Sequence, residues 1–311
     1  KFFEPIRDLA EKFNIIQTAI ASAERTFELL DTPEDMIDPP TPVPVKQVRG
    51  QVEFRNMWFS YKKDEYVLKN ISFALLEGES LAVVGATGAG KSSLINALCR
   101  FYEIAQGDIL LDGVSIQELS KHDVRRQISL VQQDVFLFSA TLRENIAYGK
   151  EDASIEDIVA AAQIAQMDDF IQELPDGYDT EIGERGSTLS GGQRQRMSIA
   201  RTILLDPPIL VLDDSTASVD ANTEEKIRIA MKEVMKGRTT FVIAHRLNTV
   251  HKADEIIVLD QGRIIERGTH NQLLSGNGSY RRIYDLQIRP QEEVMMEFEA
   301  PPNTEGVLQT S

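Results

Sequence analysis

One stretch, GATGAGKS at residues 85–92, constrains the fold of this chain more than any other. It matches the pattern G-x-x-x-x-G-K-[ST] at every position. The apolar run 81–84 before it predicts a strand, and the apolar periodicity of 94–98 after it predicts a helix. Gly85, Gly88 and Gly90 let the backbone approach an anion closely, and the N-terminus of the helix adds partial positive charge. We therefore predict a strand, loop and helix that bind the phosphates of a nucleoside triphosphate.

Side chains at the end of this loop complete the expected phosphate site. Lys91 is a mobile point charge that can reach the β and γ phosphates, and the Ser92 hydroxyl is an oxygen ligand for Mg²⁺. Ser93, the next residue, is a further phosphate-binding candidate. The alternative is a glycine-rich turn that only caps a helix.

Composition narrows the class of protein. The 311 residues carry a net charge of −16, which leaves no broad basic face for a nucleic-acid partner. Cys99 is the single cysteine, so no internal disulfide can form, and its apolar neighbours predict a core position. No run approaches about 18 apolar residues, so the chain as given is not expected to cross a membrane. Because it starts at Lys1 without a methionine, we expect it to be a piece of a longer protein.

Two segments precede the main domain. Residues 1–30 place apolar side chains at steps of about three and four, which predicts an amphipathic helix whose stripe needs a partner surface. We interpret it as the cytosolic end of a truncated transmembrane helix; the alternative is a helix packed on its own domain. Residues 31–49 are rich in proline and predict an extended, semi-rigid linker.

From residue 50 the pattern changes to short β-rich runs at 51–54, 57–61 and 71–76, which predict an antiparallel β layer. Tyr61 stands at the end of one run, before a charged loop, and its ring is a candidate to stack on a purine. The alternative is an ordinary core aromatic.

Polar residues follow three later apolar strands that the sequence predicts. They are Gln133 after the run 128–131, Asp213 and Asp214 after 209–212, and His245 after 240–244. Because the carboxyl ends of strands form the ligand crevice in nucleotide-binding folds, we expect these side chains to face the nucleotide. A carboxylate in such a place suits Mg²⁺.

The stretch LSGGQ at 189–193 predicts a second anion site, since a serine hydroxyl, free N–H groups and a helix dipole converge where a helix begins. One nucleotide does not need two such sites far apart in the sequence. Around it, residues 135–205 are mostly helical and predict an inserted subdomain. Residues 287–311 are acidic with adjacent prolines and predict a disordered tail.

Together these segments resemble the nucleotide-binding domain of ATP-binding-cassette (ABC) transporters, and specifically of exporters, over roughly residues 1–286. GATGAGKS resembles the Walker A loop, LVQQD (130–134) the Q-loop, LSGGQ the family signature, ILVLDD (209–214) the Walker B strand and His245 the switch histidine. TEIGERG (180–186) resembles the segment that couples exporters to their transmembrane domains. The resemblance implies an α/β fold with a P-loop NTPase (RecA-like) core, an antiparallel β layer and an inserted helical subdomain, together spanning residues 50–286.

In this family two domains meet head to tail, so that each ATP lies between the phosphate loop of one and the signature of the other. The resemblance implies that Tyr61 stacks on adenine and that Gln133 and Asp213 join Ser92 around Mg²⁺. It also implies that Asp214 and His245 are catalytic. By the same resemblance Ser190, Gly192 and Gln193 serve the γ-phosphate of the opposite nucleotide.

Asp214 departs from the family pattern, which has glutamate at this position as the base that polarises water. The shorter side chain retreats by roughly 1.5 Å, and a misplacement near 1 Å can cost on the order of 100-fold in rate. We therefore predict a slow, degenerate site in one half of a heterodimeric exporter, whose partner domain carries glutamate.

Two alternatives remain. One is a homodimeric exporter that uses Asp214, and the other is a soluble ABC ATPase without a transport role, against which the net acidity and TEIGERG both argue. In the longer protein we expect a transmembrane domain fused upstream, which places this domain at the cytoplasmic face of a membrane. The piece itself is expected to be soluble.

Overall fold

The chain forms two compact units, residues 1–37 and 38–311. The computed structural model describes residues 3–32, 36–45, 48–132, 135–150, 152–183, 186, 188–214, 221–244 and 250–288.

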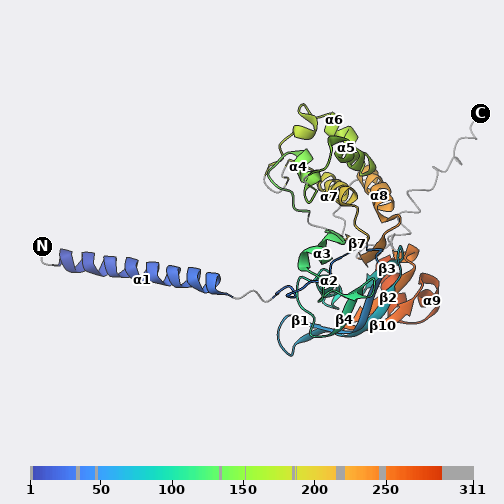
Figure 1. Ribbon diagram of the computed structural model, residues 1–311, viewed down its shortest axis with the longest axis horizontal. Coiled ribbons are helices and arrows are strands. Elements are labelled where there is room, and N and C mark those ends of the chain that lie inside the picture. Colours follow the sequence, from blue (N-terminus) through green and yellow to red (C-terminus); the bar gives the residue numbers. More distant parts are fainter. Residues whose placement is uncertain are drawn as a thin grey trace, which may run out of the picture. The chain divides into compact units, whose positions relative to one another are not determined.

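The first unit contains one long helix, α1 (Glu4–Asp31) (Figure 1). Pro5 and Glu4 in its first turn suit a helix start, because that turn needs no N–H from proline and favours negative charge. None of its residues is buried, and the apolar side chains of Phe13 and Ile20 are 58% and 53% exposed. Neither α1 nor any other described helix combines the length and the hydropathy needed to span a bilayer.

The second unit contains two sheets within the described residues. The antiparallel sheet has the order β2-β1-β4-β5, with β1 (Val52–Ser60), β2 (Tyr66–Leu75), β4 (Gln106–Leu111) and β5 (Val114–Ser115). The central sheet has the order β10-β9-β3-β8-β7-β6, with β3 (Ser80–Val84), β6 (Ile128–Val131), β7 (Ile209–Asp214), β8 (Thr239–Ala244), β9 (Glu255–Asp260) and β10 (Arg263–Gly268). All strand pairs of the central sheet are parallel except β9–β10, which is a hairpin.

β1 differs from the sequence prediction, because the runs expected at 51–54 and 57–61 form one strand. The register of β1 against β2 shifts between Phe54 and Met57. In this irregular part Asn56 has a φ of +45°, and its N–H donates to the Ser72 hydroxyl at 2.8 Å. A bulge therefore accommodates the polar residues that made the strand look interrupted.

The central sheet buries both faces, which explains its nearly continuous apolar strands. Alternate residues such as Val83, Val211 and Ile257 share a core with the antiparallel sheet and α2 (Lys91–Leu98). Residues of the opposite face pack under the helices, with Leu210 and Leu212 in one core and Val84 and Val258 in another. The sheet thus joins three hydrophobic cores into one domain.

Most of the other helices begin at a side-chain cap, as the serines and threonines before them favour. They are α3 (Lys121–Arg126), α4 (Leu142–Ala147), α5 (Ile155–Ile164), α6 (Asp168–Gln172), α7 (Gly191–Leu205), α8 (Ala221–Met235), α9 (His270–Ser275) and α10 (Ser279–Ile283), with short helical turns at Gly177–Asp179, Val250–Lys252 and Tyr284–Ile288. Figure 1 shows α4 to α7 together at one end of the second unit, with the sheets at the other. We call α4 to α7 the helical lobe.

Part of the stretch predicted as a linker lies on the second unit. The Asp38 carboxylate accepts the N–H of Lys121 at 2.8 Å and lies 3.8 Å from the buried guanidinium of Arg100. Farther along, the N–H of Val43 donates to the Glu118 carbonyl at 2.9 Å. The chain is therefore held to the domain well before β1 begins.

Candidate nucleotide-binding site

The phosphate loop, residues 85–92, joins β3 to α2. Gly85, Gly88 and Gly90 have φ values of +155°, +84° and +111°. At Gly90 the positive φ favours glycine, and a Cβ would also come within 2.7 Å of the Leu68 Cδ2 atom. The sequence prediction of strand, loop and helix is thus realised in the structure.

The N-terminus of α2 has the features of an anion site. Its cap residue Gly90 makes no side-chain cap hydrogen bond, whereas Ser120, Thr141, Ser154 and Ser190 each cap their own helix. The first N–H groups of a helix have no partner inside the helix, so an uncapped N-terminus favours an anion. Phosphate oxygens therefore fit the residues that are present.

Lys91 is buried at the base of this loop, with 6% of its surface exposed. Its ammonium donates to the carbonyls of Gly85 at 2.8 Å and Ala86 at 3.1 Å. Burial lowers the pKa of Lys91 below its ordinary value, and the negative charge of Asp213 opposes that shift. The loop thus keeps a cation beside the end of β7.

The register of the strands sets the position of Asp213 relative to the phosphate loop. Val83 of β3 pairs with Ile243 of β8, and Ile243 pairs with Asp213 of β7. The carboxylate predicted to hold Mg²⁺ and the strand that enters the phosphate loop therefore lie at the same edge of the sheet. Asp214 is the last residue of β7, and its side chain is outside what the structure describes. Gln133 and His245 also lie outside the described residues.

Tyr61 lies in the loop between β1 and β2 and contacts α2. Its hydroxyl donates to the Ser93 hydroxyl at 3.1 Å and accepts a hydrogen bond from the Asn96 amide at 2.9 Å. Its ring is close to perpendicular to those of Phe59 and Tyr102, at centroid distances of 4.8 and 4.9 Å. Two residues expected to bind nucleotide, Tyr61 and Ser93, are thus in direct contact. Asn96 was not among the predicted site residues, because no local motif marks it.

The signature, residues 189–193, opens α7 in the helical lobe. The Ser190 hydroxyl accepts the N–H of Gln193 at 3.3 Å, and the Gln193 side chain accepts the N–H of Ser190 at 2.7 Å. This reciprocal capping box fixes the start of the helix. Gly192 is buried against α8, where a Cβ would come within 2.1 Å of the Thr223 methyl group. Leu189 packs in the core of the helical lobe, whereas Ala89 of the phosphate loop packs in the core shared with the antiparallel sheet.

The segment that starts at Thr180 pairs with the chain that follows Gln133. The N–H of Leu142 donates to the Thr180 carbonyl at 3.0 Å, and the N–H of Ile182 donates to the Ala140 carbonyl at 3.1 Å. The structure thus joins two segments that the sequence analysis treated separately.

An exposed aromatic cluster lies in the same region. Phe136, Phe138 and Tyr148 are 53%, 36% and 54% exposed, and the rings of Phe138 and Tyr148 are 4.5 Å apart. Arg201 stacks over Tyr148 at 5.2 Å. Sequence reasoning missed this cluster, although Phe136 and Phe138 follow the Q-loop closely.

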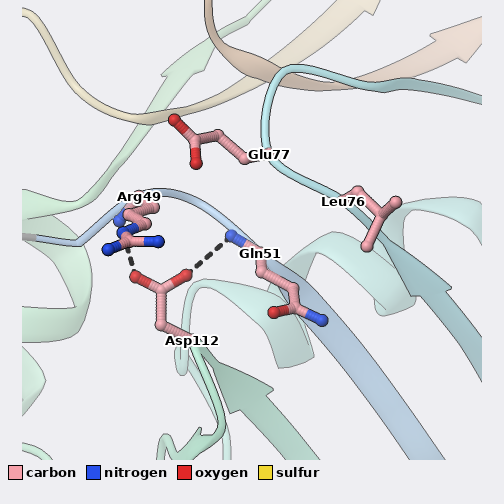
Figure 2. A pocket seen from close by; sticks show the side chains of 5 residues that line it. All are labelled: Arg49, Gln51, Leu76, Glu77 and Asp112. Carbon is pink, nitrogen blue, oxygen red and sulfur yellow. Dashed lines mark hydrogen bonds between the residues drawn. The ribbon is translucent and has the colours of Figure 1, made fainter.

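A surface hollow of about 510 Å³ contains none of the predicted site residues (Figure 2). It is lined by Arg49, Gln51, Leu76, Glu77 and Asp112. The Asp112 carboxylate accepts the backbone N–H groups of Arg49 at 2.5 Å and Gln51 at 2.8 Å, so it serves to hold the chain entering β1. An adjoining hollow of about 460 Å³ includes Gln127, Pro208 and Arg238, which precede β6, β7 and β8. These hollows therefore lie at the amino ends of the parallel strands, opposite the phosphate loop. Within the described residues, no group of three or more His, Cys, Asp or Glu side chains has metal-binding geometry.

Comparison with known proteins agrees with this geometry. The profile of a family described as ABC transporter matches residues 68–217. An ATP-dependent lipid A-core flippase of Legionella pneumophila (strain Paris) is 47% identical over 298 residues, which are 95% of this chain and 50% of the flippase. An uncharacterized ABC transporter ATP-binding protein, YknU of Bacillus subtilis (strain 168), is 48% identical over 286 residues, 92% of this chain and 49% of that protein.

Among solved structures, that of a bacterial Atm1-family ABC exporter with ATP bound superimposes with a TM-score of 0.76 at 40% identity. The match covers 96% of this chain and 50% of the exporter chain. This chain spans about half the length of the curated relatives it matches.

Proposed function

The chain belongs to the ABC transporter family and has the fold of the ATP-binding domain of its exporters, and on this premise we propose that it binds and hydrolyses ATP to power export of a substrate across a membrane. The observation that carries the proposal is the convergence of Lys91 and Asp213 beside an uncapped helix N-terminus at one edge of the central sheet. A cation, free N–H groups and a carboxylate in this arrangement suit a triphosphate with its Mg²⁺.

Each residue has a role in this proposal that follows from its place. The phosphate loop, Lys91, Ser92 and Ser93 bind phosphate, and Tyr61 packs on the base. Ser92, Gln133 and Asp213 hold Mg²⁺, which neutralises charge on the phosphates when it is bound. Asp214 orients water as the general base, with His245 contacting the γ-phosphate.

The signature has its function in a second copy of the fold. Ser190, Gly192 and Gln193 stand at a helix start in a different core from the phosphate loop of the same chain. We propose that they complete the nucleotide site of a partner domain, so that ATP binding drives two domains together. A non-identical partner that carries glutamate in place of Asp214 would make the partner's site the faster one.

We further propose that a transmembrane domain contacts the surface formed by residues 180–182 and the exposed ring cluster of Phe136, Phe138 and Tyr148. Such a cluster is unusual on a surface with no partner. The apolar stripe of α1, exposed along its length, supports attachment upstream to a membrane-embedded part. This arrangement places the domain at the cytoplasmic face of the membrane.

ATP turnover with Mg²⁺ tests the proposal, measured for the wild-type chain and for Asp214→Glu over a range of protein concentrations. Because a complete site needs two domains, activity per chain should rise with concentration. We expect slow wild-type turnover and an increase of about tenfold or more for Asp214→Glu, since the longer side chain restores the reach of the base. Asp152→Glu, the same change on an exposed residue outside the site, is the matched control.

Rapid wild-type turnover that Asp214→Glu leaves unchanged or lowers would contradict the degenerate site. It would favour a homodimeric enzyme that uses Asp214. Failure of the wild type to bind ATP at all would reject the proposed function itself.

A further inference from the structure

Asn96 of α2 is linked to Ser93 of the same helix through the Tyr61 hydroxyl, by hydrogen bonds that no sequence motif marks. The Asn96 amide donates to the Tyr61 hydroxyl at 2.9 Å, and that hydroxyl donates to the Ser93 hydroxyl at 3.1 Å. We propose that Asn96 is a positioning residue of the nucleotide site, which acts through the Tyr61 hydroxyl on both the base platform and Ser93. The proposal rests on the proposed function, in that it assigns the site to ATP.

The direction of these hydrogen bonds leaves the Ser93 proton available. Tyr61 has a single hydroxyl proton, which it donates to the Ser93 oxygen while its own oxygen accepts from the Asn96 amide. Ser93 then retains its own O–H to donate elsewhere. Hydrogen bonds in such a chain polarise one another, so Asn96 and Tyr61 make Ser93 a stronger donor toward a phosphate oxygen.

Ser93 is in the right place to use that proton. It lies in the first turn of α2, where the backbone N–H groups have no partner in the helix, and it is only 7% exposed. Ser93 and Asn96 are three residues apart, so they lie on the same face of the helix. Their spacing lets a single tyrosine hydroxyl contact both side chains.

The same hydrogen bonds fix the orientation of the Tyr61 ring. Phe59 and Tyr102 stand nearly perpendicular to the ring, at 85° and 88°, and the hydroxyl is held by α2. The residue is nevertheless 45% exposed. An exposed ring that is already ordered loses less conformational entropy when a base packs on it, so its orientation contributes to affinity.

The variants Tyr61→Phe and Asn96→Ala separate this role from stacking, because Tyr61→Phe keeps the ring. We expect each to weaken ATP binding roughly two- to tenfold, the range for one lost hydrogen bond. The double variant should bind ATP no more weakly than the weaker-binding single variant, because both changes break the same chain of hydrogen bonds.

Tyr66 of β2 and Gln106 of β4 provide matched controls. The Tyr66 hydroxyl accepts a hydrogen bond from the Gln106 amide at 3.2 Å, and its ring stands edge-on to Trp58. Tyr66→Phe and Gln106→Ala should leave the dissociation constant for ATP unchanged.

The experiment is isothermal titration of ATP into the 311-residue chain and its variants, with the unfolding temperature of each nucleotide-free variant measured in parallel. Weakened, non-additive binding at unchanged unfolding temperature supports the role of Asn96. Unchanged or tighter binding by Tyr61→Phe, or losses that add in the double variant, would overturn it while ATP binding by the wild type still supports the proposed function. A wild-type chain that does not bind ATP would overturn both. If Tyr61→Phe and Asn96→Ala lower the unfolding temperature and the affinity losses add, the contact is structural only and the inference is wrong.

Discussion

The backbone N–H of Gly262 donates a hydrogen bond of 3.1 Å to the carbonyl of Ala89 in the phosphate loop. On its other side, the Gly262 carbonyl accepts the N–H of Lys69 at 2.8 Å. A Cβ at position 262 would lie 1.9 Å from the Val67 carbonyl oxygen. The turn of the β9–β10 hairpin therefore fills the space between the phosphate loop and β2 so closely that no side chain fits.

Gly262→Ala should disturb the phosphate loop without altering any residue expected to touch nucleotide. We expect a loss of about 2–4 kcal/mol in the free energy of unfolding, from positive-φ strain and overpacking together, and a weaker affinity for ATP. Gly113→Ala is a close control, because Gly113 also follows a positive-φ residue in a hairpin turn. The φ of Gly113 is +83° and that of Gly262 is +77°, but no atom lies within 4 Å of a Cβ added at Gly113. Urea unfolding and ATP titration give both quantities. Equal effects of the two substitutions would show that the turn conformation matters and the contact with the phosphate loop does not.

The contact between Gly192 and Thr223 sets how closely α7 can pack on α8. Gly192→Ala should lower the free energy of unfolding by about 1–3 kcal/mol, because its methyl group would meet the Thr223 methyl at 2.1 Å. Adding Thr223→Ser removes that methyl and keeps the hydroxyl, so it should restore most of the loss. Chemical denaturation of the two single variants and the double variant measures the coupling. If Thr223→Ser gives no rescue, the cost of Gly192→Ala arises elsewhere in the signature.

Lys91 should make stability depend on pH in the alkaline range. Burial lowers its pKa in the folded chain, so between that lowered value and about 10.4 the unfolded chain binds more protons than the folded one. A charged Lys91 in its buried position costs stability, so the free energy of unfolding should rise as the pH rises through this window and Lys91 loses its proton. The difference in the free energy of unfolding between wild type and Lys91→Met, measured by urea denaturation at a series of pH values, should rise in favour of the wild type. A difference that is flat or falls with pH would contradict the burial cost.

Much of the site could be predicted from local sequence. The loop 85–92 fixes a strand, a turn and a helix within one short segment, and Ser190 with Gln193 marks a helix start by its own capping pattern. The family resemblance was confirmed, as was the α/β fold with parallel and antiparallel sheets. The loop and the helix start depend on residues close together in the chain.

Relationships across the chain could not be read in this way. Tyr61 and Asn96 are brought together only when β1 packs on α2. The sequence does not reveal that the Asp112 carboxylate holds Arg49 and Gln51. The pairing of Thr180 with Leu142 likewise depends on how the helical lobe folds. The predicted roles of Gln133, Asp214 and His245 stay predictions.

The anchorage of Asp38 decides where tension on the upstream chain would be felt. Asp38 is held by Lys121 and lies near Arg100, which follows α2 almost directly. A pull on the chain before Asp38 would therefore act near the C-terminal end of α2 before it acts on β1. The anchored segment and the phosphate loop therefore lie at opposite ends of α2.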